Sequence, residues 1–284
     1  MNTIEILKNF KNKQIAEHIT EYIIERVPSF SKASLLAFLC MVNVACVTEG
    51  DTKAVLSEPT KDLKSKAQAH SELAASYINI GKYEVAQNEL KKAIEADPDY
   101  SGSYFVAGVL AMKLGSPEDA EKNFRIAQKD ERNSAASHEL GVLLCRTGRA
   151  KESIQYFDKA ISNPLFPNKG MSNLRAGECI TRLDLKRAEK YLSAVLVENP
   201  ALIVALYRLA EVYFIDDKLL RARAHLERYK AAAGASPQAL FLGYRIENKA
   251  KSVKAADEYS EQLLKQFPGS EEAKSLRKEI GLRG

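Results

Sequence analysis

The position of one cysteine suggests covalent chemistry. Cys46 lies at the end of a run of fifteen mostly apolar residues, 33–47; Lys32 precedes the run and Ala45 directly precedes the cysteine. A positive flank, a short apolar middle and a small residue at the end are the parts of a bacterial secretory signal. A cysteine at that end is typical of a lipobox, where the thiol is lipidated before cleavage. We therefore predict Cys46 as a lipidation site.

The length of this run limits what it can be. A transmembrane helix needs about 20 apolar residues, whereas runs of about 10–14 are typical of core helices or signal segments. Asn43 stands where a lipobox usually has leucine, so a buried helix of a cytosolic domain is an alternative. A translation start further down, for instance at Val27, would turn the run into an ordinary signal.

The expected organisation has four parts. Residues 1–31 form an amino-terminal extension, most of which would not be translated if translation started at Val27. Residues 32–46 form the lipoprotein-type signal segment. Residues 47–66 are polar and contain Gly and Pro, which predicts a linker. Residues 67–284 form the folded domain.

The other reactive residue types do not form a catalytic pattern. The four histidines, His18, His70, His138 and His225, are scattered and lack metal-ligand spacing. No GxxxxGK, GxGxxG or CxxC motif occurs. The net charge is +5, with acids and bases interleaved along the chain and no basic block that would bind nucleic acid. We expect a non-enzymatic protein with no cofactor, metal or small-molecule substrate.

A repeat of about 34 residues dominates the sequence from about residue 67 to 268. Small residues recur at two positions of the unit. The first set is Ala74, Gly108, Gly141, Gly177 and Ala210, and the second set is Ala86, Ala120, Ser153, Ala188, Ala222 and Ala256. Small side chains allow helices to approach closely, and Gly-, Asp-, Pro- or Asn-containing turns separate the segments. Each unit is therefore predicted to be a pair of antiparallel helices.

A helix pair of this kind cannot bury its apolar face alone, so neighbouring units must stack. We predict an all-α fold, a right-handed superhelix of about six helix-pair units with a groove on its inner side. A polar capping helix is expected after Ser270, which can cap its start, with Glu271 and Glu272 in the first turn. Extra residues at 162–170 interrupt the period between the third and fourth units.

The first helix of each unit lines the groove in such a solenoid, and steps of three and four residues select the side chains that face it. Aromatic and arginine side chains are good anchors for a bound peptide. The candidate partner-binding residues are Phe105, Val109, Met112, His138, Arg182, Tyr207, Phe214, Phe241 and Arg245. The alternative for the apolar members is that they only fill the layers between units.

The repeat resembles the tetratricopeptide repeat, and four features narrow the resemblance. They are LFLGYRIE at 240–247, FPGS at 267–270, NPLFP at 163–167, and the cysteines that end LLC and GEC. Over about residues 67–276 the chain looks like the type IV pilus biogenesis/stability family, PilF/PilW. Members of that family are tetratricopeptide lipoproteins of the outer membrane.

The resemblance implies a pilotin-like role. Family members bind the outer-membrane secretin subunit and help it to reach the outer membrane and multimerise, or they stabilise the assembled pilus. The expected partner is the secretin subunit, and the expected location is the periplasmic face of the outer membrane, with a lipid anchor. The alternatives are a scaffold lipoprotein for other envelope (cell-wall) complexes and a regulatory repeat domain of a cytosolic enzyme complex.

Two further cysteines, Cys145 and Cys179, fall near the ends of the first helices of adjacent units. An oxidising periplasm would allow them to pair, and the chain-entropy model gives such a cross-link a stabilisation of about 3–4 kcal/mol. The alternative is that both are small buried apolar side chains. Export of the protein favours the disulfide.

Overall fold

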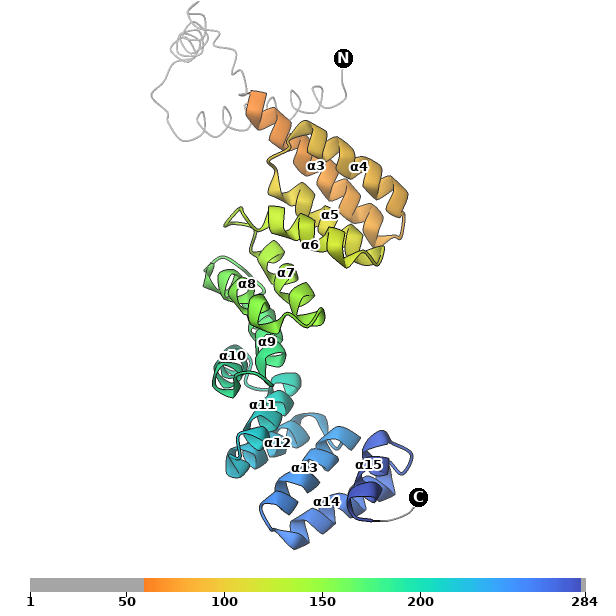
Figure 1. The fold of residues 1–284 in the computed structure, drawn as a ribbon, viewed down its shortest axis with the longest axis vertical. Helices are drawn as coiled ribbons and strands as arrows, with labels where there is room; N and C mark the ends of the chain where they lie inside the picture. Colours follow the sequence, from red (N-terminus) through yellow and green to blue (C-terminus); the bar gives the residue numbers. More distant parts are fainter. Residues whose placement is uncertain (1–58, 282–284) are drawn as a thin grey trace, which may run out of the picture. The chain divides into compact units, whose positions relative to one another are not determined.

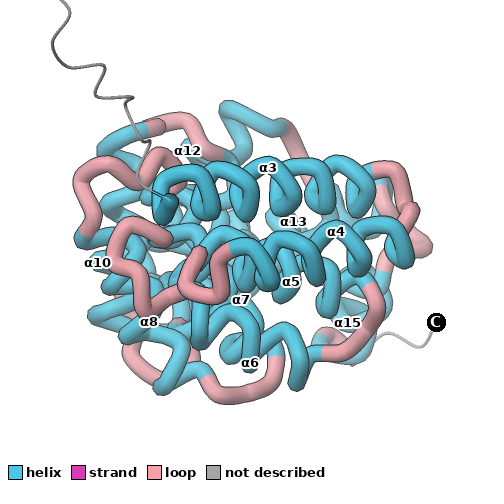
Figure 2. Tube along the Cα trace, turned by 90° about the horizontal axis from the view of Figure 1, so that it is seen from above, coloured by secondary structure: helices cyan, strands magenta, loops and turns pink. Residues whose placement is uncertain are grey.

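The computed structural model describes residues 59–281 (Figure 1). The predicted extension, the signal segment with Cys46, and the linker up to residue 58 lie outside these residues. Within them the chain forms the helices α3 to α15 and no strand, and Figure 2 shows only helices joined by loops. No helix in this range is long and apolar enough to cross a bilayer.

Twelve of these helices form six consecutive pairs. The pairs are α3 (Pro59–Asn79) with α4 (Tyr83–Ala96), α5 (Ser101–Lys113) with α6 (Pro117–Ala127), α7 (Ser134–Arg146) with α8 (Ala150–Ser162), α9 (Lys169–Ile180) with α10 (Leu185–Glu198), α11 (Ile203–Ile215) with α12 (Leu219–Ala233), and α13 (Pro237–Lys249) with α14 (Val253–Gln266). The second helix of each pair also packs against the first helix of the next pair. The predicted all-α fold of six stacked helix pairs is confirmed.

The predicted capping helix is also present. Helix α15 (Glu271–Glu279) packs against α13 and α14. The Ser270 side chain accepts a hydrogen bond from the Ala273 amide at 3.1 Å, and Glu271 and Glu272 lie in the first turn. Ala273 and Leu276 are fully buried against the sixth pair, so α15 covers apolar surface that a seventh pair would otherwise bury.

Helix α3 begins at Pro59, ahead of the predicted boundary at Ala67. Residues 62–66 are exposed, and Ala67 is the first buried side chain among the described residues. An ion pair between Asp62 and Lys66, 3.0 Å long, supports this solvated turn. The boundary at Ala67 therefore marks where burial begins, whereas the helix starts earlier within the predicted linker.

Glycine allows the two helices of a pair to cross closely. A Cβ atom at Gly108 would lie 2.5 Å from the Phe124 ring, and a Cβ atom at Gly141 would lie 2.9 Å from the Phe157 ring. Both rings are fully or almost fully buried. The same position in the sixth pair, Gly243, lies against the Tyr259 ring. The small residues of the repeat thus face a large side chain on the second helix, as the repeat predicted.

The turns inside five of the six pairs contain one residue with a left-handed backbone. Gly81, Gly115 and Gly148 have φ values of 74°, 75° and 81°, and no atom outside their own neighbourhood would meet an added Cβ. The last two pairs have Asp217 and Lys251 at the same place, with φ values of 59° and 57°. Glycine adopts this conformation without strain, whereas other L-residues do not.

Buried polar contacts join neighbouring pairs. The Ser71 and Ser103 hydroxyls, from α3 and α5, are hydrogen-bonded at 3.0 Å. Nδ1 of His138 on α7 lies 2.8 Å from the Ser172 hydroxyl on α9. Both contacts place a buried serine against one particular partner in the adjacent unit.

The inserted segment between α8 and α9 also packs on the third pair. The Phe166 side chain is buried, with its ring centroid 6.3 Å from that of His138. The neighbouring Leu165 is 87% exposed. The extra residues of NPLFP therefore place one apolar side chain inward and one in solvent.

Candidate protein-interaction surface

The candidate site is the accessible surface of the first helices of the pairs, α3, α5, α7, α9, α11 and α13, which we call the first-helix surface. First helices of adjacent pairs contact one another, for example α3 with α5, α7 with α9, and α11 with α13. Their side chains therefore form a surface that continues from one unit to the next. This arrangement suits a bound segment of another polypeptide.

Helix α5 contributes apolar side chains to this surface. Phe105, Val109 and Met112 are all half-buried and pack against the cluster that contains Phe124 and Leu140. The Phe105 and Phe124 rings lie 6.1 Å apart between centroids. These side chains therefore fill space between units and still expose part of their surface. The sequence allowed these residues either to bind a partner or to fill the layers between units. In the structure the buried part of each side chain fills a layer, and the exposed part remains accessible to a partner.

Two predicted binding residues have other positions. Helix α9 ends at Ile180, so Arg182 lies in the following turn and is exposed there rather than on a first helix. His138 is half-buried between units, and its ring meets the Phe157 ring edge-on, with the two centroids 5.9 Å apart. Burial lowers the pKa of His138, and the nearby charge of Arg175 lowers it further. His138 therefore contributes mainly to the contact between units.

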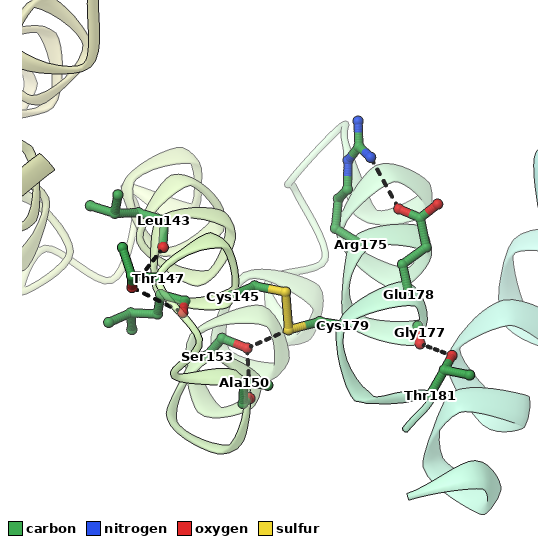
Figure 3. Close-up of a disulfide and its surroundings, with 11 residues drawn as sticks. Leu143, Cys145, Thr147, Ala150, Ser153, Arg175, Gly177, Glu178, Cys179 and Thr181 are labelled. Carbon is green, nitrogen blue, oxygen red and sulfur yellow. Dashed lines mark hydrogen bonds and ion pairs between the residues drawn. A yellow bond between two sulfur atoms is a disulfide. The ribbon is translucent and has the colours of Figure 1, made fainter. Parts of the chain in front are cut away.

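A disulfide joins the middle of the first-helix surface (Figure 3). The Sγ atoms of Cys145 on α7 and Cys179 on α9 are bonded, with the Cα atoms 5.9 Å apart. The Ser153 hydroxyl lies 3.3 Å from the Cys179 sulfur and donates to the Ala150 carbonyl. The two cysteines also line a cavity of about 370 Å³, which extends to Val142. The cross-link therefore connects adjacent units beside an open part of the surface.

Next to the disulfide, charged side chains link α9 to α11. Arg175 donates to Glu178 at 3.0 Å, as Figure 3 shows. Arg208 donates to Glu178 at 3.0 Å and to Glu211 at 2.8 Å. The guanidinium of Arg208 also lies 5.9 Å from the Tyr207 ring centroid. The predicted residue Tyr207 thus lies beside a row of paired charges.

The last two pairs combine aromatic rings with cations. The Arg245 guanidinium lies 4.7 Å from the Phe214 ring centroid and 5.9 Å from that of Phe241. The Lys249 ammonium lies 5.3 Å from the Phe214 centroid and 2.8 Å from the Asp217 carboxylate. Three predicted residues, Phe214, Phe241 and Arg245, are therefore brought together. Lys249, one helical turn after Arg245, completes the group and was not predicted.

The sixth pair differs from the others in which residues it exposes. The positions equivalent to Phe105 and Val109 of the second pair are Leu240 and Tyr244, and both are buried in the cluster that includes α15. The exposed Arg245 lies one residue further along α13, on the side that meets α11. The capping helix therefore takes up part of the first-helix surface at this end.

Among residues 59–281 no group of three His, Cys, Asp or Glu side chains is arranged to hold a metal ion. Carboxylates near the surface are paired with arginines, as Glu178 is with Arg175 and Arg208. The arrangement offers apolar contact and charge for recognition of a polypeptide.

Comparison with known families identifies the repeat. The tetratricopeptide repeat family model matches residues 71–125 and 105–169. These ranges cover the glycine crossings at Gly108 and Gly141 and the disulfide residue Cys145. Residues 71–169 of this chain therefore match the tetratricopeptide repeat. Proteins built from tetratricopeptide repeats are generally non-catalytic scaffolds that bind protein partners.

Individual relatives extend the similarity beyond the matched repeats. This chain is homologous to the type IV pilus assembly protein PilF of Pseudomonas aeruginosa. The two sequences are 24% identical over 252 residues, which cover 87% of this chain and 98% of PilF. The crystal structure of PilW, described as a widely conserved type IV pilus biogenesis factor, matches with a TM-score of 0.61 and 28% identity over 74% of this chain and 97% of PilW. The P. aeruginosa PilF structure shares the fold, with a TM-score of 0.63, 23% identity and coverage of 77% of this chain and 100% of PilF.

Proposed function

We propose that this tetratricopeptide protein is a pilotin-like, non-enzymatic factor of type IV pilus biogenesis. The observation that carries the proposal is the homology to PilF over 98% of the length of that protein. The match covers 87% of this chain, so it is not confined to one helix pair. In this proposal the protein binds the outer-membrane secretin subunit and assists its localisation and multimerisation.

The first-helix surface supplies the contacts for such binding. Phe105, Val109 and Met112 expose apolar surface on α5, which would accept apolar side chains of the secretin subunit. Arg245 is exposed and has no ion-pair partner among the described residues, so it would accept a carboxylate. Aromatic and arginine side chains are the residue types that most often dominate binding energies at interfaces.

The proposed location is the periplasmic face of the outer membrane, with a lipid on Cys46. Support comes from the sequence, in which Lys32, the apolar run and Ala45 precede this cysteine. Palmitate labelling with and without globomycin tests the attachment. Incorporation that depends on Cys46 and a processing block by globomycin are expected. An unlabelled chain, or a mature protein that retains residues 1–25, would contradict this part.

The binding role is tested by deleting the gene and measuring secretin multimers and surface pili. Both should fall, and the wild-type gene should restore them. A Met112→Asp variant should restore them poorly, whereas Lys122→Glu, a charge change at an exposed position of α6, should restore them fully. Normal multimers and pili in the deletion strain would overturn the proposal. Capture of cell-wall enzymes in place of secretin would indicate an envelope scaffold.

A further inference from the structure

The turns within the helix pairs all lie at one edge of the stack. Successive helices alternate in direction, so the turns from first to second helices follow one edge of the winding stack, and the turns from one pair to the next follow the other edge. We call the former the inner-turn edge. It includes residues 80–83, 114–117, 147–150, 181–185, 216–219 and 250–253. Its residues at equivalent repeat positions can therefore be compared directly.

One position at this edge changes character along the chain. It is the residue two places before the small residue of the second helix. The first two pairs have acidic side chains there, Glu84 and Glu118. The last four pairs have Lys151, Lys186, Leu220 and Lys254, and all four are exposed. At this position the later pairs therefore have lysine or leucine in place of an acid. The acids that remain at this part of the edge have partners: Asp184 accepts from the Arg187 amide, Asp216 pairs with Lys218, and Asp217 pairs with Lys249.

Neighbouring residues strengthen this change. Arg146, Arg182 and Lys251 are exposed at the same edge. Neither these three nor the lysines at 151, 186 and 254 have an ion-pair partner among residues 59–281. By contrast, most other arginines near the second helices are paired, as Arg149 is with Glu121 and Glu152. This edge therefore carries cations that the fold does not neutralise.

Aliphatic side chains stand between these cations. Leu183, Leu220 and Val253 are 54%, 77% and 70% exposed. Leu183 directly follows Arg182, and Val253 directly precedes Lys254. Ile80 and Leu114 are exposed at the same edge in the first two pairs, but these pairs have Glu84 and Glu118 at the compared position. At the later turns the exposed aliphatic side chains alternate with uncompensated cations, which is the composition of surfaces that bind anionic membranes.

We propose that the inner-turn edge of the last four helix pairs docks on an anionic lipid surface. The lysine and arginine side chains contact phosphate headgroups, and Leu183, Leu220 and Val253 enter the boundary between headgroups and acyl chains. An acidic protein would satisfy the cations but gives no reason for isolated aliphatic side chains at the turn tips. The docking is independent of partner binding by the first-helix surface, and it would fix which edge of the protein faces the bilayer.

Vesicle sedimentation tests the proposal with the chain from residue 46 onward carrying Cys46→Ser, so that neither a lipid nor the apolar signal segment contributes to binding. Vesicles of phosphatidylglycerol and phosphatidylethanolamine are compared with vesicles of phosphatidylcholine alone. The chain should bind the anionic vesicles, and binding should weaken as salt is raised. In the triple variant Lys151→Glu, Lys186→Glu and Lys254→Glu, the partition coefficient should fall by about 100-fold, since each basic residue near an anionic surface contributes about fivefold.

A matched control reverses the same amount of charge elsewhere. Lys122, Lys129 and Lys265 are exposed and lie away from the inner-turn edge. Changing these three to Glu should alter binding severalfold less than the edge variant, although both have the same net charge. Circular dichroism verifies that each variant is folded. If both triple variants lost the same amount of vesicle binding, net charge alone would explain the loss. That result would overturn the proposal.

The apolar contribution is tested separately with Leu220→Ser and Val253→Ser together. Binding to anionic vesicles should fall severalfold, and the loss should persist at high salt, where the lysine contribution is screened. Unchanged binding in this variant would exclude insertion. Equal binding of the parent chain to phosphatidylcholine vesicles, or no binding to either vesicle, would overturn docking while leaving the proposed secretin binding untouched.

Discussion

At α5, Phe105 packs against another ring, that of Phe124, whereas Phe214 and Phe241 of α11 and α13 both lie beneath the Arg245 guanidinium. The backbone at the two ends of the first-helix surface is the same repeated helix pair. The side chains differ, and so do their surroundings: the second pair is followed by another pair, while the sixth is closed by α15. One fold thus offers a partner an apolar contact at one end and a cationic, aromatic contact at the other.

This difference has a consequence for recognition. Apolar contact contributes affinity that depends little on salt, whereas contact with an unpaired arginine depends on the charge of the partner and is screened by salt. A partner that touches both ends must have an apolar segment and an acidic group at a fixed separation. The contributions of the two ends to binding can be measured separately with point variants.

The largest expected effect comes from the disulfide between α7 and α9, which lie between the two regions along the chain. Replacing Cys145 and Cys179 by Ser should lower the free energy of unfolding by about 3–4 kcal/mol, because a sequence separation of 34 residues is no longer closed in the unfolded chain. Urea unfolding followed by circular dichroism measures this loss. Dithiothreitol should destabilise the parent chain to a similar extent and leave the double variant unchanged. A parent chain that is insensitive to reduction would contradict the cross-link.

Binding to the secretin subunit should distinguish the two ends. Met112→Gln and Arg245→Gln should each weaken affinity by about tenfold, as expected for residues near the centre of an interface. The loss caused by Arg245→Gln should shrink as salt is raised, and that caused by Met112→Gln should not. Titration calorimetry at several salt concentrations measures both, with Lys122→Gln as the control. Identical salt dependence in the two variants would remove the distinction between the ends.

The turns provide a smaller and reciprocal test. Lys251→Gly should stabilise the protein by about 0.5–1 kcal/mol and Gly115→Lys should destabilise it by about 1 kcal/mol, because φ is 57° at Lys251 and 75° at Gly115. The Gly115→Lys change meets no packing obstacle, because nothing lies within 4 Å of a Cβ atom added at Gly115. Thermal unfolding of both variants measures the effects. Shifts of the same sign would show that the two regions do not share this turn conformation.

The smallest expected effect is a dependence on pH that involves one histidine in each region. Burial lowers the pKa of His138 on α7 and of His225 on α12 below 6.5. Below that pH the unfolded chain binds protons that the folded chain does not, so the free energy of unfolding should fall as the solution is acidified. His138→Gln or His225→Gln should each reduce this slope, measured by urea unfolding between about pH 7 and 5. If neither change altered the slope, neither histidine would be a source of the pH dependence.

Local and repeated features of this fold were predictable from the sequence. Gly108 and Gly141 recur with the period of the repeat, and each lies against a ring from the same helix pair. The start of α15 follows from Ser270 alone. Such features depend on residues that are close in sequence, so periodicity and capping rules are sufficient to find them.

Features that depend on helix ends and on neighbouring pairs were less accessible. Arg182 was misplaced because α9 ends at Ile180 and the turn begins earlier than periodic spacing implies. The contact of Arg245 with Phe214 joins residues 31 positions apart on different units, which no pattern within one unit can show. The cations of the inner-turn edge become visible only when Lys151, Lys186 and Lys254 are compared at the same position of successive units.

The buried contacts between adjacent first helices limit how such a chain can diversify. Ser71 is matched to Ser103, and Ser172 is matched to His138, in each case across one boundary between pairs. Exchanging the order of two pairs would leave these hydroxyls or the imidazole facing aliphatic neighbours, with desolvated polar atoms. Although the helix pairs look interchangeable, each has a fixed place in the array, and duplication or shuffling of pairs would require compensating changes at every new junction.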